Sequence, residues 1–439
     1  MAKQKSVGKE ELPPLQTAPT GLYVPPPKLT FPSAWLLALV MAILCPWAAF
    51  LAWSFSTNRA SAIGNAVSGG ANTVQSVRNS AAGPWGRLET TPVVISPPQE
   101  FISSDWGPAN PDRWHFPQTS RNQIFDFLLS AGLDPATARQ LADAASPDPA
   151  KSGHIVRPPA SVVENLSPQV RANLYVQLGV LPQNSSQYAA YRHFGKSAQD
   201  WLGNSRLAPE TLRIVEPLVY SWKEFLYFAD IDLVRRKLGE GPELQKLAKA
   251  LFRESTFLVR VHIDDIEQAD KVASYWGLGG RRTDIRPLLE SVAAAGPNSS
   301  IDIGHLLPPL ARDLLYRYPK LALGDFYKPG LKNCFWTALN FFATTPNDRY
   351  LNPQLAIEDL KRDYYIVQDN YQLGDIVALA DPDDTIYHTS VYLAQDLVFG
   401  KNGLSPLAPW TIVPLSRLRG YYPDPMGGHN TTFYRRKDF

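Results

Sequence analysis

The last quarter of the chain contains three strand-like segments in close succession, and this pattern constrains the fold more than any other feature of the sequence. Strands are expected at residues 374–379, 388–393 and 397–403, where apolar and β-branched residues lie between turn-forming residues. A segment rich in Asp at 381–384 predicts the first turn, and a short hairpin joins the second and third strands. We therefore expect a β-sheet in this part of the chain.

Cys334 lies where a helix is expected to begin. Pro329 and Gly330 interrupt regular structure, and apolar residues then fall at helical spacing from Phe335 to Phe342. In the first turn of a helix, unpaired N–H groups and the positive end of the dipole favour a thiolate over a thiol. We therefore expect Cys334 to be more fully ionised at neutral pH than a free cysteine, whose pKa is about 8.5.

The order of Cys334 at a helix start and His388 at a strand start resembles the papain-like fold, and more closely the NlpC-type cell-wall cysteine peptidases. That family also carries a Gly-Asp pair before the histidine, here Gly374-Asp375, and a polar residue on the following strand, here Asn402. The resemblance covers only the C-terminal part of the chain. It implies that Cys334 is the nucleophile, that His388 is the base and that Asn402 orients the imidazole.

The resemblance implies hydrolysis of an amide bond, most naturally in the stem peptides of peptidoglycan, which would be the substrate partner. A papain-like acyltransferase or lipid hydrolase acting through the same three residues is a related alternative. A catalytically inactive scaffold that binds the wall or another protein is a further alternative, because bulky Phe335 and Trp336 stand where the family has small residues. A lone cysteine among aromatic residues can also be a small buried hydrophobe.

Residues 34–55 are apolar and uncharged. At about 1.5 Å per residue this segment is long enough to cross a hydrocarbon core about 30 Å thick, which predicts one transmembrane helix. The lysines before it predict a disordered cytoplasmic tail at 1–33, an anchor in the inner membrane and export of the rest of the chain to the periplasm or beyond. Cleavage after a signal peptide, near Ala60-Ser61-Ala62, is the competing interpretation.

The remaining chain divides into three predicted parts. Residues 56–114 are rich in Ser, Ala, Gly and Pro and predict a flexible linker. Residues 115–320 predict a mostly helical domain of unknown role, with helix starts at Asp134-Pro135 and Ser167-Pro168. Residues 321–439 form the papain-like domain, so the predicted fold class is α+β.

The composition excludes some classes of partner. A net charge of +2, from 43 basic and 41 acidic residues, gives no indication of nucleic-acid binding. The histidines are scattered without the spacing of metal ligands, so neither a metal nor a cofactor is expected. The two cysteines, Cys45 and Cys334, do not suggest a disulfide framework.

Overall fold

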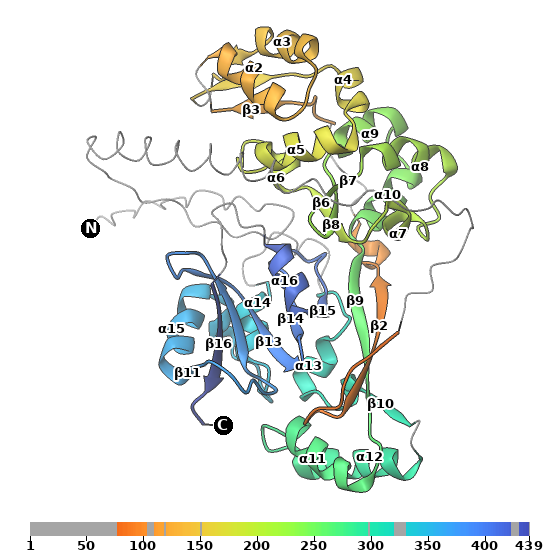
Figure 1. Cartoon of the computed structure of the whole chain (residues 1–439), viewed down its shortest axis with the longest axis vertical. Helices are drawn as coiled ribbons and strands as arrows, with labels where there is room; N and C mark the ends of the chain where they lie inside the picture. The colour runs from red at the N-terminus through yellow and green to blue at the C-terminus, as the bar shows by residue number, and fades with distance from the viewer. Residues whose placement is uncertain are drawn as a thin grey trace, which may run out of the picture. The chain divides into compact units, whose positions relative to one another are not determined.

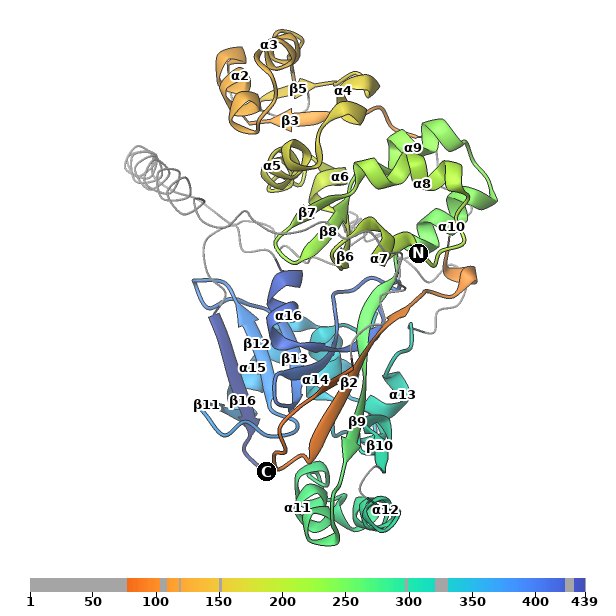
Figure 2. The ribbon, with the colours of Figure 1, turned by 45° about the vertical axis from the view of Figure 1, so that its right-hand side comes forward.

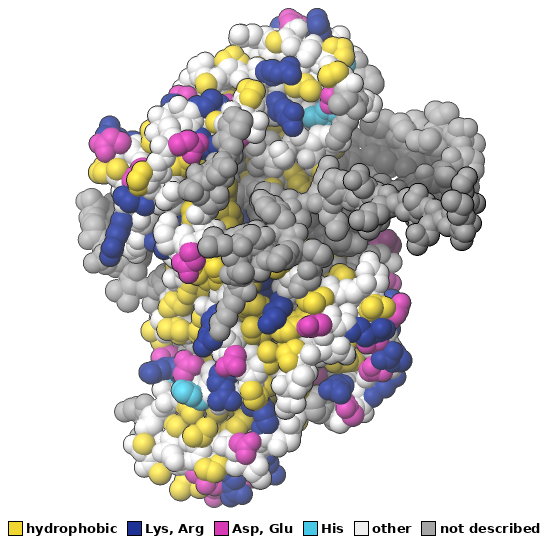
Figure 3. All heavy atoms as spheres, turned by 180° about the vertical axis from the view of Figure 1, so that it is seen from behind, with side chains coloured by type: hydrophobic (Ala, Val, Ile, Leu, Met, Phe, Trp, Pro, Cys, Tyr) yellow, Lys and Arg dark blue, Asp and Glu magenta, His cyan; other side chains and the backbone are white. Residues whose placement is uncertain are grey.

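The computed structural model describes residues 77–102, 109–117, 120–149, 152–296, 299–319, 331–422 and 430–438. Figure 1 shows a helix-rich N-terminal region, a long β-ribbon and a C-terminal sheet flanked by helices. Of the described residues, 41% are helical and 24% lie in strands, which makes the fold α+β. Acidic and basic side chains are interspersed on the face drawn in Figure 3, in keeping with the small net charge.

The C-terminal sheet is six-stranded and antiparallel, in the order β11-β16-β12-β13-β14-β15. Three of these strands, β12, β13 and β14, confirm the strands expected from the sequence. The strands are β11 (Tyr364–Val367), β12 (Ile376–Ala380), β13 (Ile386–Ala394), β14 (Leu397–Lys401), β15 (Trp410–Pro414) and β16 (Asn430–Arg436).

Helices pack on both faces of this sheet (Figure 1). On one face, α14 (Cys334–Leu339) and α15 (Pro353–Asp363) share a core with Ala378 and Val391, and the 3-10 turn η5 (Asp348–Leu351) lies between these helices in the chain. On the other face, α16 (Leu415–Tyr421) packs with Val377 and Leu379. Neighbouring strand residues point to opposite faces, so β12 contributes to both cores.

A second core is built by the helical region that follows β3. Two of its helices start as predicted, because Asp134 and Ser167 accept hydrogen bonds from Thr137 N and Val170 N. The helices are α2 (Arg121–Ser130), α3 (Pro135–Asp143), α4 (Ala160–Asn165), α5 (Pro168–Leu178), α6 (Ser185–Tyr188), α7 (Ala198–Leu202), α8 (Pro209–Val215), η2 (Glu216–Leu218), α9 (Ile231–Leu238) and α10 (Pro242–Leu251). Two small sheets complete the region, formed by β3 (Trp114–Phe116), β4 (Ser146–Pro147) and β5 (His154–Val156), and by β6 (Tyr191–Phe194), β7 (Tyr220–Trp222) and β8 (Phe225–Phe228).

A four-stranded sheet has the order β1-β2-β9-β10, and two helices lie at one end of its long strands β2 and β9 (Figure 2). Its residues from Phe257 to Leu315 share the core of α14 and the six-stranded sheet, not that of the helical region. The elements are β1 (Arg78–Asn79), β2 (Arg87–Ile95), η1 (Gln99–Phe101), β9 (Glu254–His262), α11 (Ile266–Trp276), α12 (Arg282–Ala294), β10 (Ser300–Asp302), η3 (Ile303–His305) and α13 (Pro309–Leu314).

The predicted flexible linker at 56–114 is wrong for its described part, because β2 is a regular strand. It pairs with β9 along its full length, from Arg87 opposite His262 to Ile95 opposite Glu254. Pro92 lies in its middle; among the described residues β1 pairs with β2 at Glu89 and Thr90 and not at Pro92, which has no N–H to donate. The pairing partner is far away in sequence, and local composition therefore missed it.

The predicted architecture with a transmembrane helix also requires correction. No helix among the described residues is long and apolar enough to cross a membrane. The longest of them, α12, has 13 residues, about 20 Å at 1.5 Å per residue, against a hydrocarbon core of about 30 Å. The predicted tail at 1–33 and span at 34–55 lie outside the described residues. The described fold is α+β without a membrane span.

Thr256 tests how β9 is attached to the edge of the six-stranded sheet. Its fully buried hydroxyl donates to Ile412 O at 2.9 Å and accepts from Ile412 N at 3.0 Å. Thr256→Val should lower the free energy of unfolding by about 2–4 kcal/mol, because two buried backbone groups lose their partner. Urea unfolding measures the change, and the partly exposed Thr91→Val on β2 is the matched control; equal effects of the two variants would contradict the assignment.

Candidate functional site

Cys334 is the first residue of α14, as predicted. The N-cap residue Asn333 fixes this helix start, because its Oδ1 accepts from Trp336 N at 2.8 Å and its Nδ2 donates to Leu351 O at 3.1 Å. The Thr337 hydroxyl donates to Asn333 O at 2.8 Å, which ties the first turn together. Asn333 is buried, so this cap is shielded from water and holds the cysteine in a defined place.

The sulfur of Cys334 lies in a buried environment beside Thr389 of β13. Only 6% of the residue is exposed. Backbone N–H groups of Thr389 and Phe335 and the positive charge of Lys401 act to lower the pKa of the thiol, but burial outweighs them and raises it. The expected low pKa is therefore wrong for this structure, and the thiol is neutral at neutral pH.

Lys401, at the end of β14, is fully buried beside this thiol. Its Nζ donates to Gly403 O and to Ser405 O, each at 2.8 Å, and burial lowers its pKa to about 7. Lys401 pairs with Trp410 on β15, whose Nε1 donates to Thr337 of α14 at 2.9 Å. Paired residues point to the same face of a sheet, so Lys401 faces α14 and its cysteine.

His388 lies within β13 and is completely buried. Its Nδ1 is hydrogen-bonded to Tyr422 Oη at 2.7 Å, and the two ring centroids are 4.5 Å apart. Its Nε2 has no hydrogen-bond partner in the described part of the chain. Burial lowers the pKa of His388 to about 3, so the imidazole is neutral at neutral pH and can accept a proton.

The side chains of Cys334 and His388 lie on opposite faces of β13, and no hydrogen bond joins them. His388 pairs with Leu379, whose side chain lies in the core beneath α16, whereas the next residue, Thr389, pairs with Ala378 in the core beneath α14. Tyr422 connects the two sides, because it bonds His388 and its pKa is raised by burial and also by the charge of Cys334. Tyr422 therefore interacts with both groups, although they face opposite sides of the sheet.

Asn402, the predicted orienting residue, lies beyond the end of β14 and is partly buried. It lines a cavity of about 50 Å³ together with residues of β6, the end of α10 and the segment 405–408. Among the described residues its side chain has no hydrogen bond to His388, whose Nδ1 is bound by Tyr422 instead. The role of Asn402 stays a prediction, and Tyr422 is a residue that sequence reasoning missed, since no spacing relates it to His388.

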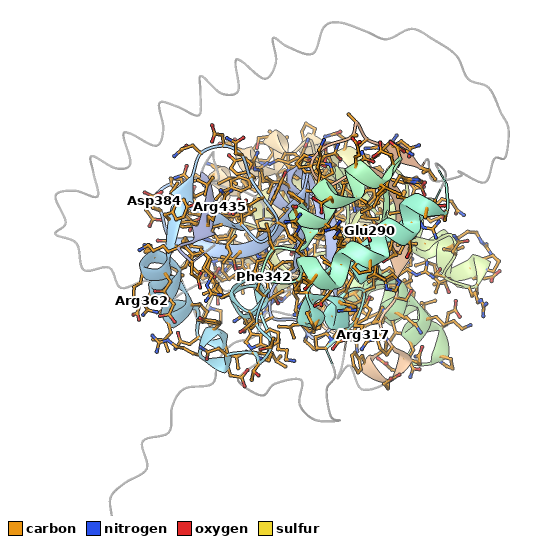
Figure 4. All side chains as sticks on the ribbon, turned by 90° about the horizontal axis from the view of Figure 1, so that it is seen from below. Glu290, Arg317, Phe342, Arg362, Asp384 and Arg435 are labelled. Atoms are coloured by element: carbon orange, nitrogen blue, oxygen red, sulfur yellow. The ribbon has the colours of Figure 1, made fainter. Side chains whose placement is uncertain are left out.

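The Gly-Asp pair before the histidine has a structural explanation. Gly374 has φ +92°, and a Cβ there would lie 2.1 Å from the Phe342 ring, so only glycine fits. Asp375 forms a bidentate ion pair with Arg435 of β16, with both N–O distances 2.8 Å. Figure 4 labels Phe342 and Arg435. Asp375 therefore ties the segment that leads into β12 to β16.

Three consecutive residues of β13 carry buried polar atoms without a protein partner among the described residues: His388 Nε2, Thr389 Oγ1 and Ser390 Oγ. A buried polar atom without a partner costs about 1–3 kcal/mol, so such atoms are uncommon and often belong to functional sites. Their position beside Cys334 gives the site free donors and acceptors on both faces of the strand. No group of three or more potential metal ligands occurs among the described residues.

Comparisons with known proteins give no further identification. No family model, no curated protein and no solved structure matches the chain. The resemblance to NlpC-type peptidases therefore stays a prediction that rests on the motif residues.

The raised pKa of Cys334 predicts slow alkylation at neutral pH. In a Cys45→Ser background, iodoacetamide should react with native Cys334 only as the pH rises above the free value of about 8.5, because burial disfavours the thiolate. Mass spectrometry follows the labelling, and the same chain in denaturant is the control; rapid labelling of the native chain at pH 6 would show a low-pKa thiolate instead.

The lowered pKa of His388 predicts a loss of stability in acid. Between about pH 6.5 and pH 3 the unfolded chain binds a proton at this residue that the folded chain does not, so stability falls as pH falls. From pH 7 to pH 5 this residue should contribute about 2 kcal/mol of lost stability. Urea unfolding of His388→Phe should therefore show a correspondingly weaker pH dependence, whereas the exposed His305→Gln should behave like the parent.

Proposed function

We propose that the chain is a cysteine hydrolase that cleaves amide bonds, with Cys334 as nucleophile and His388 as base. The observation that supports the proposal is the neutral, buried His388, whose Nε2 is unpaired among the described residues and which precedes Thr389, the residue whose backbone N–H acts on the Cys334 thiol. Peptidoglycan stem peptides are the proposed substrate class, which rests on the sequence resemblance. Location at a membrane likewise stays a prediction from the sequence.

The geometry implies a particular resting state. Thiol and imidazole are both neutral before substrate binds, because burial disfavours both charges. For Nε2 to act as a base, the hydrogen of the imidazole must lie on Nδ1, where it donates to Tyr422 Oη. Because Sγ and Nε2 face opposite sides of β13, the proposal requires a rearrangement of this part of the sheet that brings them together when the substrate binds.

In the proposed reaction Sγ attacks the amide carbonyl while its proton passes to His388 Nε2. The tetrahedral intermediate then loses the amine, which takes that proton from the imidazolium as the C–N bond breaks. Water, deprotonated by His388, attacks the thioester and releases a carboxylic acid and the free thiol. Lys401 stabilises the thiolate, and the N–H of Cys334 at the helix start is placed to stabilise the oxyanion.

A second candidate function is a scaffold that binds its partner without chemistry. It is favoured by the enclosure of Cys334, which is 6% exposed, and by the burial that raises the pKa of its thiol. Inert structural cysteines have this environment, whereas reactive ones are partly exposed. Binding to peptidoglycan fragments without cleavage would favour this candidate over the hydrolase.

Four variants test the hydrolase. Cys334→Ser and His388→Phe should abolish release of peptides from peptidoglycan fragments, because they remove the nucleophile and the proton acceptor. Tyr422→Phe should lower kcat by roughly tenfold to a thousandfold, since the imidazole loses the partner that holds its orientation. Asn402→Ala should change kcat much less. Mass spectrometry resolves the products, and cleavage by Cys334→Ser at the rate of the parent would exclude Cys334 as nucleophile.

A further inference from the structure

We propose that Arg192, in the helical region, is a positioning residue that holds Tyr422 and, through it, His388. This inference rests on the proposed function and gives the helical region a role in it. Arg192 lies on β6, outside the six-stranded sheet that carries the cysteine and the histidine. Its partner is the C-terminal end of α16, one residue before Tyr422.

The contact between Arg192 and α16 has two components. The guanidinium donates a hydrogen bond to Tyr421 O, the last carbonyl of the helix. Its Cζ also lies 4.8 Å from the centroid of the Tyr421 ring, within the range of a cation–π interaction. A cation at a helix C-terminus interacts favourably with the helix dipole. The direction of the chain as it leaves Tyr421, and so the place of Tyr422, is set at this contact.

The Tyr421 side chain is enclosed by residues of other strands. Its Oη donates to Glu254 Oε2 of β9 at 2.7 Å, and its ring lies 5.1 Å from that of Phe225 on β8. A Cβ on Gly420 would lie 2.5 Å from Phe225 Cε2, so glycine permits this close approach. Tyr421 therefore cannot shift without disturbing both the helical region and β9.

The earlier turn of α16 is attached in a similar way. Arg417 is buried, donates to Ser255 O of β9 at 3.2 Å and has its Cζ 3.5 Å from the Phe194 ring centroid on β6. β6 therefore contacts α16 at two points, through Arg192 and through Phe194. Tyr422, the residue that follows α16, is hydrogen-bonded through its Oη to His388 Nδ1.

Arg192 affects the position of His388 and takes no part in the reaction itself. Arg192 contacts neither Cys334 nor His388 in any hydrogen bond or ring contact of the described residues, so it can influence the imidazole only through α16 and Tyr422. Small displacements of a catalytic group can cost about a hundredfold in rate. The loss of Arg192 should therefore lower kcat and leave KM unchanged.

The experiment is a double-mutant cycle in the full chain with Arg192→Met, Tyr422→Phe and the combination. The ¹⁵N resonances of His388, assigned by their loss in His388→Phe, report whether Nδ1 keeps its hydrogen bond. Arg192→Met should shift the Nδ1 resonance in the same direction as Tyr422→Phe and lower kcat by roughly tenfold to a hundredfold. The double variant should be no slower than Tyr422→Phe, because both act through one contact.

Arg192→Lys, which keeps a charge and a donor, should recover part of the Nδ1 resonance shift, and Arg213→Met on the exposed face of α8 is the matched control. An unchanged Nδ1 resonance in Arg192→Met, or fully additive losses of kcat, would overturn the positioning role. If the parent cleaves nothing, the hydrolase proposal fails, while the resonance of Nδ1 still decides whether Arg192 positions His388.

Discussion

The rest of the structure depends on the contacts that β9 makes with three other strands. One edge of β9 pairs with β2, the opposite edge pairs with β10, and the side chain of Thr256 bonds the backbone of β15. An edge strand exposes a row of unpaired N–H and C=O groups, and a hydroxyl can satisfy one of each. At Ile412, where no described strand pairs with the edge of the six-stranded sheet, a side chain therefore attaches this edge to β9. Glu254 and Ser255, at the N-terminal end of β9, accept hydrogen bonds from residues of α16.

The candidate site is governed by a competition between burial and charge. Backbone N–H groups and Lys401 favour the Cys334 thiolate, but burial has the larger effect on its pKa. Burial also keeps His388 neutral, and the Tyr422 phenol keeps its proton for the same reason. The site therefore holds its reactive groups in uncharged forms, and charge separation would accompany the attack on a substrate instead of preceding it.

The sequence predicted those features that depend on neighbouring residues. The helix start at Cys334 and the strands around His388 follow from local periodicity and breakers, and the structure has both. Features that depend on distant residues were missed. The sequence gives no measure of the burial that raises the pKa of Cys334. Local composition predicts a linker where β2 forms, because the pairing partner β9 lies far along the chain. Tyr422 reaches His388 only through the path of α16, and no local pattern predicts it, whereas Asn402 is predicted from its place on the third expected strand.

The enclosure of Lys401 has a consequence for the medium in which the protein works. Salt screens exposed charges over about 8 Å at physiological ionic strength, but it screens buried charges much less. The electrostatic interaction between Lys401 and Cys334 is not exposed to solvent, because the lysine is fully buried and its Nζ donates hydrogen bonds to Gly403 O and Ser405 O. Exposed pairs such as Arg213 and Glu210 lack this protection. The electric field at the sulfur is thus set by the fold and is nearly independent of the ions around it.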